Sequence, residues 1–212
     1  MNDKDETKEK LKEGALFTWE AIKTIGAVAL FVVFFRYFVI QPFYIVGNSM
    51  NPGFLQGEYL FIDEASYYLR APARGEVVVF KHPESGCNEF VEGHKLWSRI
   101  AQGPCTSYIK RVIGLPGETV TLKNGKFTIR NKENPSGFTL TENYIQPGVI
   151  TLGDQTVTLP KDQFYVVGDN REANQSYDSR QWGPLKREYV TGKAWLRLLP
   201  ATKLGFISKA RY

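Results

Sequence analysis

Histidine is scarce in this chain of 212 residues, and its scarcity limits the available chemistry. The two histidines, His82 and His94, lie in a polar stretch dense with glycine and proline. A Ser-His-Asp triad needs one of them, so the sequence disfavours a histidine-based serine hydrolase. The chain also has no His-Glu-x-x-His motif and no glycine-rich phosphate loop, which argues against those zinc and nucleotide-phosphate sites.

Cysteine is equally rare, with Cys87 and Cys105 as its two copies. Together with the two histidines they would complete a two-Cys, two-His metal set. Neither the cysteines nor the histidines are close together, however, so the spacing matches no standard zinc pattern. We therefore expect no metal and no other cofactor.

Long runs of alanine, leucine and glutamate are few, whereas the chain contains 11 Tyr, 14 Phe and 19 Gly. This composition favours β structure. The net charge is +5, but the positive residues are scattered and do not alternate with aromatic residues, so we expect no nucleic-acid partner. A mildly basic balance also suits work beside an anionic membrane surface.

An apolar segment near the N-terminus is the strongest bulk signal. Ala15 to Phe35 covers 21 residues, or about 31 Å of helix, which fits a hydrocarbon core. Glu20 and Lys23 lie inside it, so an amphipathic interfacial helix or a cleaved signal peptide are alternatives. Because no small-x-small cleavage site precedes Arg36, we predict a retained transmembrane anchor.

The rest of the chain is punctuated by short β-branched and aromatic runs, which predict strands. Lys-Asn-Gly-Lys at 123–126 predicts a two-residue hairpin turn. We predict an N-terminal tail over 1–14, an anchor over 15–36 and a mainly β domain over 37–212. About 120–160 is predicted to form an inserted β-rich segment.

Three stretches carry candidate chemistry, each with an ordinary structural alternative. Ser49 lies in the turn "IVGNSMNPGF", where a hydroxyl is usually a solvated turn residue. Lys110 lies in "SYIKRVIGLPGE", on the same predicted strand face as Tyr108; packing against apolar residues would lower its pKa, whereas an edge lysine would point to water. In "FYVVGDNREANQSYDSRQWGP", Asp178 and Arg180 are spaced to pair and hold a polar loop rigid.

Taken together, these stretches resemble the bacterial type I signal peptidases over nearly the whole chain after Arg36. "RYFVIQPFYIVGNSMNPGF", "GEVVVFKHP", "YIKRVIGLPGE" and "VVGDNREANQSYDSRQWGP" are similar to four family motifs in the family's order. The resemblance implies a β-barrel-like catalytic domain and a serine endopeptidase with Ser49 as nucleophile and Lys110 as general base. It assigns orienting or supporting roles to Gly168, Asp169, Ser176, Asp178 and Arg180.

The chain departs from the family pattern at several points. Gly47 stands where many members have a serine that binds the oxyanion, so the backbone N–H of Ser49 must carry more of that role. Val46 replaces a frequent proline. Two extra residues in the final motif leave Ser179 as a competitor of Ser176 for orienting the lysine. The role of the insertion at about 84–107 stays open.

The resemblance also implies an extended substrate cut after an Ala-x-Ala-like site. The residues expected to bind it, or to leave room for its backbone, are Phe43, Ile45, Gly47, Met50, Phe54, Val79, Tyr108 and Ile109. The expected partners are signal peptides of exported preproteins, the lipid bilayer and the export translocon. The expected location is the bacterial plasma membrane, with one span, residues 1–14 in the cytoplasm and the catalytic domain outside.

Three other functions remain as alternatives. A self-cleaving repressor of the serine–lysine class would carry an N-terminal DNA-binding domain where this chain has a predicted anchor. A specialised signal peptidase of a conjugation or pilus system differs only in its substrates. A catalytically dead binding module is disfavoured because the motif residues are present. On the extracytoplasmic side, Cys87 and Cys105 are expected to form a disulfide.

Overall fold

The computed structural model describes residues 3–38, 40–81 and 107–212, with side chains described over 14–32, 41–81 and 107–212. The chain divides into two compact units, 1–39 and 40–212, and each is considered by itself. His82, His94, Cys87 and Cys105 lie outside the described residues, so the predicted disulfide also lies outside them.

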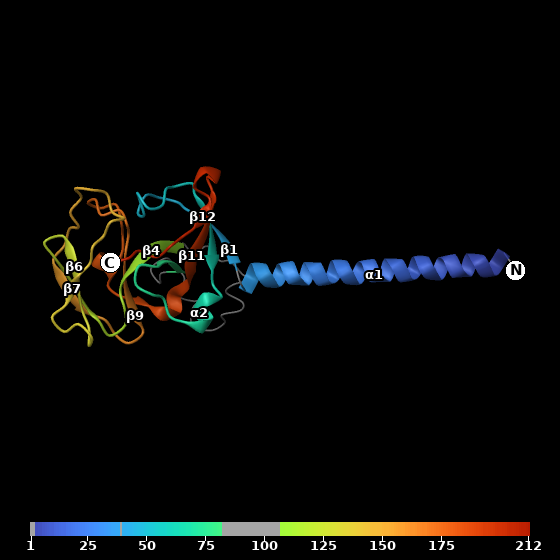
Figure 1. Cartoon of the computed structure of the whole chain (residues 1–212), viewed down its shortest axis with the longest axis horizontal. Coiled ribbons are helices and arrows are strands. Elements are labelled where there is room, and N and C mark those ends of the chain that lie inside the picture. The colour runs from blue at the N-terminus through green and yellow to red at the C-terminus, as the bar shows by residue number, and fades with distance from the viewer. Residues whose placement is uncertain (1–2, 39, 82–106) are drawn as a thin grey trace. The chain divides into compact units, whose positions relative to one another are not determined.

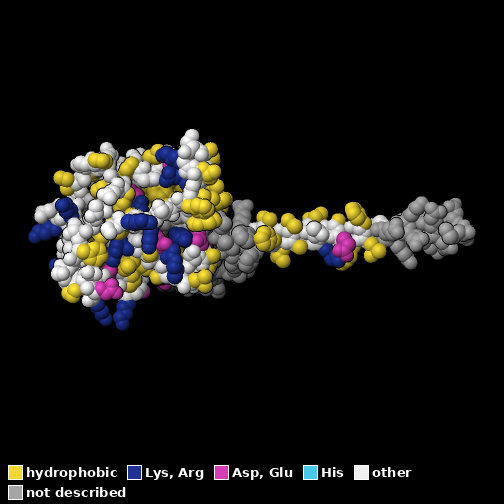
Figure 2. Space-filling model, viewed as in Figure 1, with side chains coloured by type: hydrophobic (Ala, Val, Ile, Leu, Met, Phe, Trp, Pro, Cys, Tyr) yellow, Lys and Arg dark blue, Asp and Glu magenta, His cyan; other side chains and the backbone are white. Residues whose placement is uncertain are grey.

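The N-terminal unit is a single helix, α1 (Asp3–Phe38) (Figure 1). Its stretch Gly14–Val32, 19 residues, is long and apolar enough to cross a membrane. Large apolar side chains are exposed along it (Figure 2) and are distributed around the helix rather than on one face. Lys23 Nζ donates to Glu20 Oε1 at 2.6 Å, so the two charges inside the stretch pair with each other.

The larger sheet of the C-terminal unit contains eight strands (Figure 1). Its order is β1-β2-β11-β3-β4-β9-β10, with β12 paired to β11. The strands are β1 (Ile40–Tyr44), β2 (Tyr59–Asp63), β3 (Val77–Lys81), β4 (Ser107–Gly114), β9 (Gln163–Val167), β10 (Leu185–Lys186), β11 (Val190–Leu199) and β12 (Gly205–Phe206). Among the described residues no pairing closes this sheet, so barrel closure stays a prediction.

A second, four-stranded sheet is built from the segment between β4 and β9. Its order is β7-β6-β5-β8, with β5 (Thr119–Lys123), β6 (Lys126–Arg130), β7 (Phe138–Thr139) and β8 (Gln155–Thr158). The predicted hairpin turn joins β5 to β6, where Asn124 and Gly125 have φ of 50° and 75°. Alternate side chains of β5 and β6 are buried, which gives this sheet its own apolar core.

Strand β4 joins the cores of the two sheets. It pairs antiparallel with β3 on one side and β9 on the other. Ile109, Val112 and Ile113 each enter a different cluster of buried apolar side chains. A strand that is buried on both faces usually consists of apolar residues throughout. In β4 two buried charged residues, Lys110 and Arg111, interrupt the apolar sequence.

Short helical turns complete the unit. They are α2 (Ser66–Leu69), α5 (Ser179–Trp182) and the 3₁₀ turns Arg187–Tyr189 and Ala201–Lys203. The Asp178 carboxylate accepts the backbone N–H of Arg180 and caps α5. The prediction of a mainly β protein with one N-terminal apolar helix is confirmed.

Candidate active site

Ser49 lies in a tight turn that packs on the apolar core. Asn51 N donates to Asn48 O at 3.0 Å, and Phe54 N donates to Met50 O at 2.8 Å. The side chains of Met50 and Phe54 are 1% and 3% exposed. These buried side chains anchor the turn, while Ser49 itself stays half-buried.

Lys110 reaches this turn from the middle of β4. Its Nζ lies 2.8 Å from Ser49 Oγ and donates to Ile109 O at 2.9 Å. The Lys110 Nζ also lies 5.9 Å from the centroid of the Tyr108 ring, so both side chains are on one strand face as alternation predicts. Lys110 is only 2% exposed, which makes it an interior lysine and not an edge-strand lysine.

Burial changes the acidity of this lysine. Desolvation of the ammonium lowers the pKa of Lys110 to about 8, and the charge of Arg180 acts in the same direction. The carboxylates of Asp178 and Asp169 oppose this and limit the fall. The balance leaves a neutral amine accessible near neutral pH.

Residues 168–170 hold the Ser49 turn from the other side. Asn170 N donates to Ser49 O at 3.0 Å, and Asn170 Nδ2 donates to Asn48 O at 3.0 Å. Gly168 lies so close that a Cβ there would be 2.4 Å from Ser49 O and 2.2 Å from Ser176 Oγ. Only glycine fits this position, and it brings Ser176 next to the turn.

Asp178 is the centre of a buried polar cluster. Its Oδ2 accepts hydrogen bonds from Ser176 Oγ at 2.6 Å and Gly168 N at 2.9 Å, while Arg180 Nε donates to Oδ1 at 2.9 Å. Burial alone would raise the pKa of Asp178, but the bonds from Arg180 and Ser176 hold that pKa below its ordinary value. Ser179 Oγ instead accepts from Val166 N at 3.0 Å, so this hydroxyl is used within the sheet.

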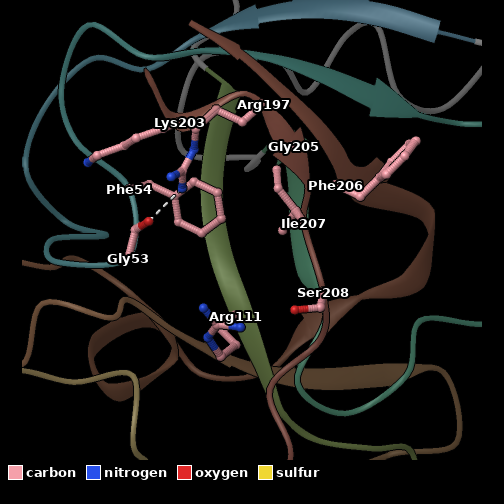
Figure 3. A pocket seen from close by; sticks show the side chains of 9 residues that line it. All are labelled: Gly53, Phe54, Arg111, Arg197, Lys203, Gly205, Phe206, Ile207 and Ser208. Carbon is pink, nitrogen blue, oxygen red and sulfur yellow. Dashed lines mark hydrogen bonds between the residues drawn. The ribbon is translucent and has the colours of Figure 1, made fainter. Parts of the chain in front are cut away.

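Arg111 points to the opposite face of β4 from Lys110. It donates to both carboxylate oxygens of Asp169, at 2.7 and 2.6 Å, and to Gly75 O at 2.8 Å. It lines a pocket of about 240 Å³ together with Phe54 and Arg197 (Figure 3). Neither Ser49 nor Lys110 lines this pocket.

Most of the residues predicted to bind substrate gather in one apolar cluster beside the turn. Ile45, Met50, Phe54, Val79 and Ile109 are buried together, and Phe43 packs against them. Tyr108 lies on the face of β4 opposite to that of Ile109 and stacks on Phe80, with ring centroids 5.9 Å apart. Gly47 has φ of +89°, and a Cβ there would meet nothing within 4 Å, so the space beside it is open.

Sequence reasoning missed the part that Asn170 plays in holding the turn. The only signal was its place next to Asp169, directly after a buried strand. The backbone N–H of Asn170 donates to Ser49 O, and its side-chain amide donates to Asn48 O, 122 residues earlier in the chain. No local pattern predicts such bonds.

Comparison with known families decides what this arrangement belongs to. The family described as "Signal peptidase, peptidase S26" matches residues 18–199. The chain belongs to the signal peptidase S26 family. The matched range contains Ser49, Lys110, Ser176, Asp178 and Arg180, so every residue of the polar site falls within it.

Named signal peptidases are similar over most of this chain. Signal peptidase I of Leptolyngbya laminosa is 38% identical over 88% of this chain and 82% of its own length. Probable signal peptidase I-2 of a Synechocystis strain is 35% identical over 96% of this chain and 84% of its own length. A solved signal peptidase I from Enterococcus faecalis is 26% identical, with a TM-score of 0.41 over 58% of this chain and 97% of that chain.

Proposed function

We propose that this chain is a membrane-anchored serine endopeptidase that removes signal peptides from exported preproteins, with Ser49 as nucleophile and Lys110 as general base. The distance of 2.8 Å between Lys110 Nζ and Ser49 Oγ carries the proposal. Membership of the signal peptidase family and the named relatives support the substrate class.

The chemistry follows from the state of the lysine. A pKa of about 8 leaves roughly one lysine in ten neutral at pH 7, against roughly one in 2,500 for an ordinary lysine. Neutral Lys110 takes the proton as Ser49 Oγ attacks the scissile carbonyl and forms the tetrahedral intermediate. Lys110 then gives that proton to the leaving amine, and the C–N bond breaks to leave the acyl-enzyme. Water hydrolyses the acyl group with Lys110 again as base.

The oxyanion of the tetrahedral intermediate needs donors beside Ser49. Within the part of the chain that the structure describes, nothing accepts a hydrogen bond from the Ser49 N–H. Gly47 provides no hydroxyl there, but it leaves open space for the substrate backbone. The Ser49 N–H is therefore the main protein donor that we assign to the oxyanion.

Ser176, Asp178 and Arg180 are assigned supporting roles. Ser176 lies against Gly168 beside the Ser49 turn, whereas Ser179 is engaged by Val166 N, which favours Ser176 as the orienting hydroxyl. Its bond to Asp178 fixes the hydroxyl, and Arg180 compensates the charge of that carboxylate. Arg180 thereby limits how far the carboxylate raises the pKa of Lys110.

The substrate is assigned as an extended peptide that adds a strand beside the turn and presents small residues before the cut. Ile45, Met50 and Ile109, which the resemblance assigns to the substrate pocket, are buried together in the cluster beside the Ser49 turn. This supports Ala-x-Ala-like specificity. The signal peptide itself, the bilayer and the export translocon are the partners that such a substrate implies.

Cleavage by the full chain in detergent tests this proposal. A preprotein with an Ala-x-Ala site is incubated with the wild type, with Ser49→Ala and with Ser136→Ala, an exposed serine used as a matched control. The wild type and the control should release mature protein whose N-terminus begins after the site. Binding of the preprotein without cleavage by the wild type would show a dead binding module instead.

The same proposal assigns residues 40–212, the body of the protein, to the outside of the cytoplasm of a bacterial cell. The helical segment Gly14–Val32 would anchor this body in the membrane. Protease added to intact spheroplasts should digest residues 40–212, and a cytoplasmic marker should survive. Protection of the body under those conditions would overturn the assigned side of the membrane.

A further inference from the structure

Glu142 lies between β7 and β8, in the segment that carries the smaller sheet, and outside all four motifs. Its carboxylate is buried against Arg171, with Arg171 Nη2 at 2.5 Å from Oε1 and Nη1 at 3.0 Å from Oε2. The two side chains are 6% and 0% exposed. A paired, two-bond contact of this kind fixes the orientation of the guanidinium as well as its position.

Arg171 joins this segment to the loop after β9. Its Nη1 also donates to Thr151 Oγ1 at 2.9 Å, and its Nε donates to Gly168 O at 2.8 Å. Tyr144 contributes its hydroxyl, 3.3 Å from Nη2. The guanidinium donates all of these hydrogen bonds, and every acceptor except Gly168 O lies in the segment that carries the smaller sheet.

The loop that Arg171 holds is the loop that holds the nucleophile. Gly168 abuts Ser49 O, and Asn170, the residue before Arg171, donates to both Ser49 O and Asn48 O. A series of contacts thus runs from Glu142 to Arg171, from Arg171 to Gly168 O, and from residues 168–170 to the Ser49 turn.

We infer that Glu142 is a positioning residue for the nucleophile, acting through Arg171 and Asn170. Without the carboxylate, the buried guanidinium lacks its counter-charge and must move toward water or another acceptor, which releases Gly168 O. The Ser49 turn then loses its fixed distance to Lys110. Because the apolar cluster below the turn is not touched, substrate binding should change little.

This inference rests on the proposed function, since its readout is preprotein cleavage. The full chain in detergent is compared with Glu142→Gln and with Glu133→Gln, an exposed glutamate of the same segment. Glu142→Gln should lower kcat about 10- to 100-fold, the range expected when a reacting group is misplaced by about 1 Å. KM should stay within about threefold. The acid midpoint of the pH–kcat profile should not move, because Glu142 is not among the groups that set the pKa of Lys110.

A double variant separates positioning from a general loss of structure. Asn170→Ala removes the bond from Asn170 Nδ2 to Asn48 O and keeps the backbone bond to Ser49 O. If Glu142 acts through this loop, Glu142→Gln in the Asn170→Ala background should therefore lower kcat by less than the product of the two single losses. Multiplied losses in the double variant would overturn the inference, as would a folded Glu142→Gln with the kcat of Glu133→Gln.

If Glu142→Gln does not fold, Thr151→Val tests the inference instead. This variant removes one hydrogen-bond acceptor of Arg171 and keeps the ion pair between Arg171 and Glu142. A several-fold fall in kcat at unchanged KM supports the inference, and an unchanged kcat overturns it. If the wild type and Glu133→Gln both fail to cleave, the proposed function itself fails and the inference falls with it.

Discussion

Replacing Lys110 with methionine should abolish cleavage and, at neutral pH, make the protein more stable. Methionine keeps an unbranched side chain of similar length but has no ammonium group to bury. Lys110 is 2% exposed, and burial lowers its pKa to about 8 from the ordinary value of about 10.5. The folded wild type therefore carries the free-energy cost of burying an ammonium group, and Lys110→Met does not.

The size and pH dependence of this cost follow from the two pKa values. Below pH 8 the lysine is protonated in both the folded and the unfolded state, and the full cost is about 3 kcal/mol. Between pH 8 and 10.5 the folded state has released the proton while the unfolded state keeps it, so wild-type stability rises with pH. The advantage of Lys110→Met should thus shrink by about 2 kcal/mol between pH 7 and pH 9.5.

Urea unfolding of the full chain in mild detergent, followed by tryptophan fluorescence at pH 7 and pH 9.5, measures this difference. Lost hydrogen bonds and altered packing contribute equally at both pH values and cancel. Lys186→Met, at an exposed lysine, is the matched control and should show no such change. An advantage of Lys110→Met that is the same at both pH values would refute the buried-amine argument.

Four further outcomes follow from the site. Ser176→Ala should lower kcat more than it raises KM, with the acid limb of the pH–rate profile altered; the opposite split would remove its orienting role. Ser179→Ala should lower the melting temperature and keep most activity, because it strands a buried backbone N–H at a cost of about 1–3 kcal/mol. Gly168→Ala should abolish activity, since a Cβ would be 2.4 Å from Ser49 O, and normal turnover would contradict the tight contact. Unreduced, unfolded protein should show no free thiol at Cys87 or Cys105, and two reactive thiols would count against the disulfide.

The regular strands were predictable because their patterns are local. The apolar runs at 59–62, 76–80 and 107–113 became β2, β3 and β4, and the Asn124–Gly125 pair formed the expected hairpin turn. The strands β10 and β12 were not predicted, because two residues cannot display alternation. They exist because a long neighbour supplies their partners.

The site was also predictable only in part, because some of its contacts join residues that are far apart in the chain. The family resemblance paired Ser49 with Lys110, and strand alternation placed Lys110 on the face of Tyr108. The resemblance assigned the Ser176 hydroxyl to the orientation of Lys110, whereas in the structure that hydroxyl donates to Asp178. The sequence also could not predict the bonds that Asn170 makes to the Ser49 turn, since these depend on how β9 ends beside that turn.

The pH dependence of preprotein cleavage by the wild type and by Lys110→Ala tests the assignment of Ser49 and Lys110 most directly. Single-turnover rates with saturating enzyme remove contributions from product release. The wild-type rate should rise tenfold per pH unit below its midpoint and level off above about pH 8, where Lys110 becomes neutral. Lys110→Ala should show no turnover at any pH; near-normal cleavage by this variant would contradict the account, because it would leave Ser49 with a different base.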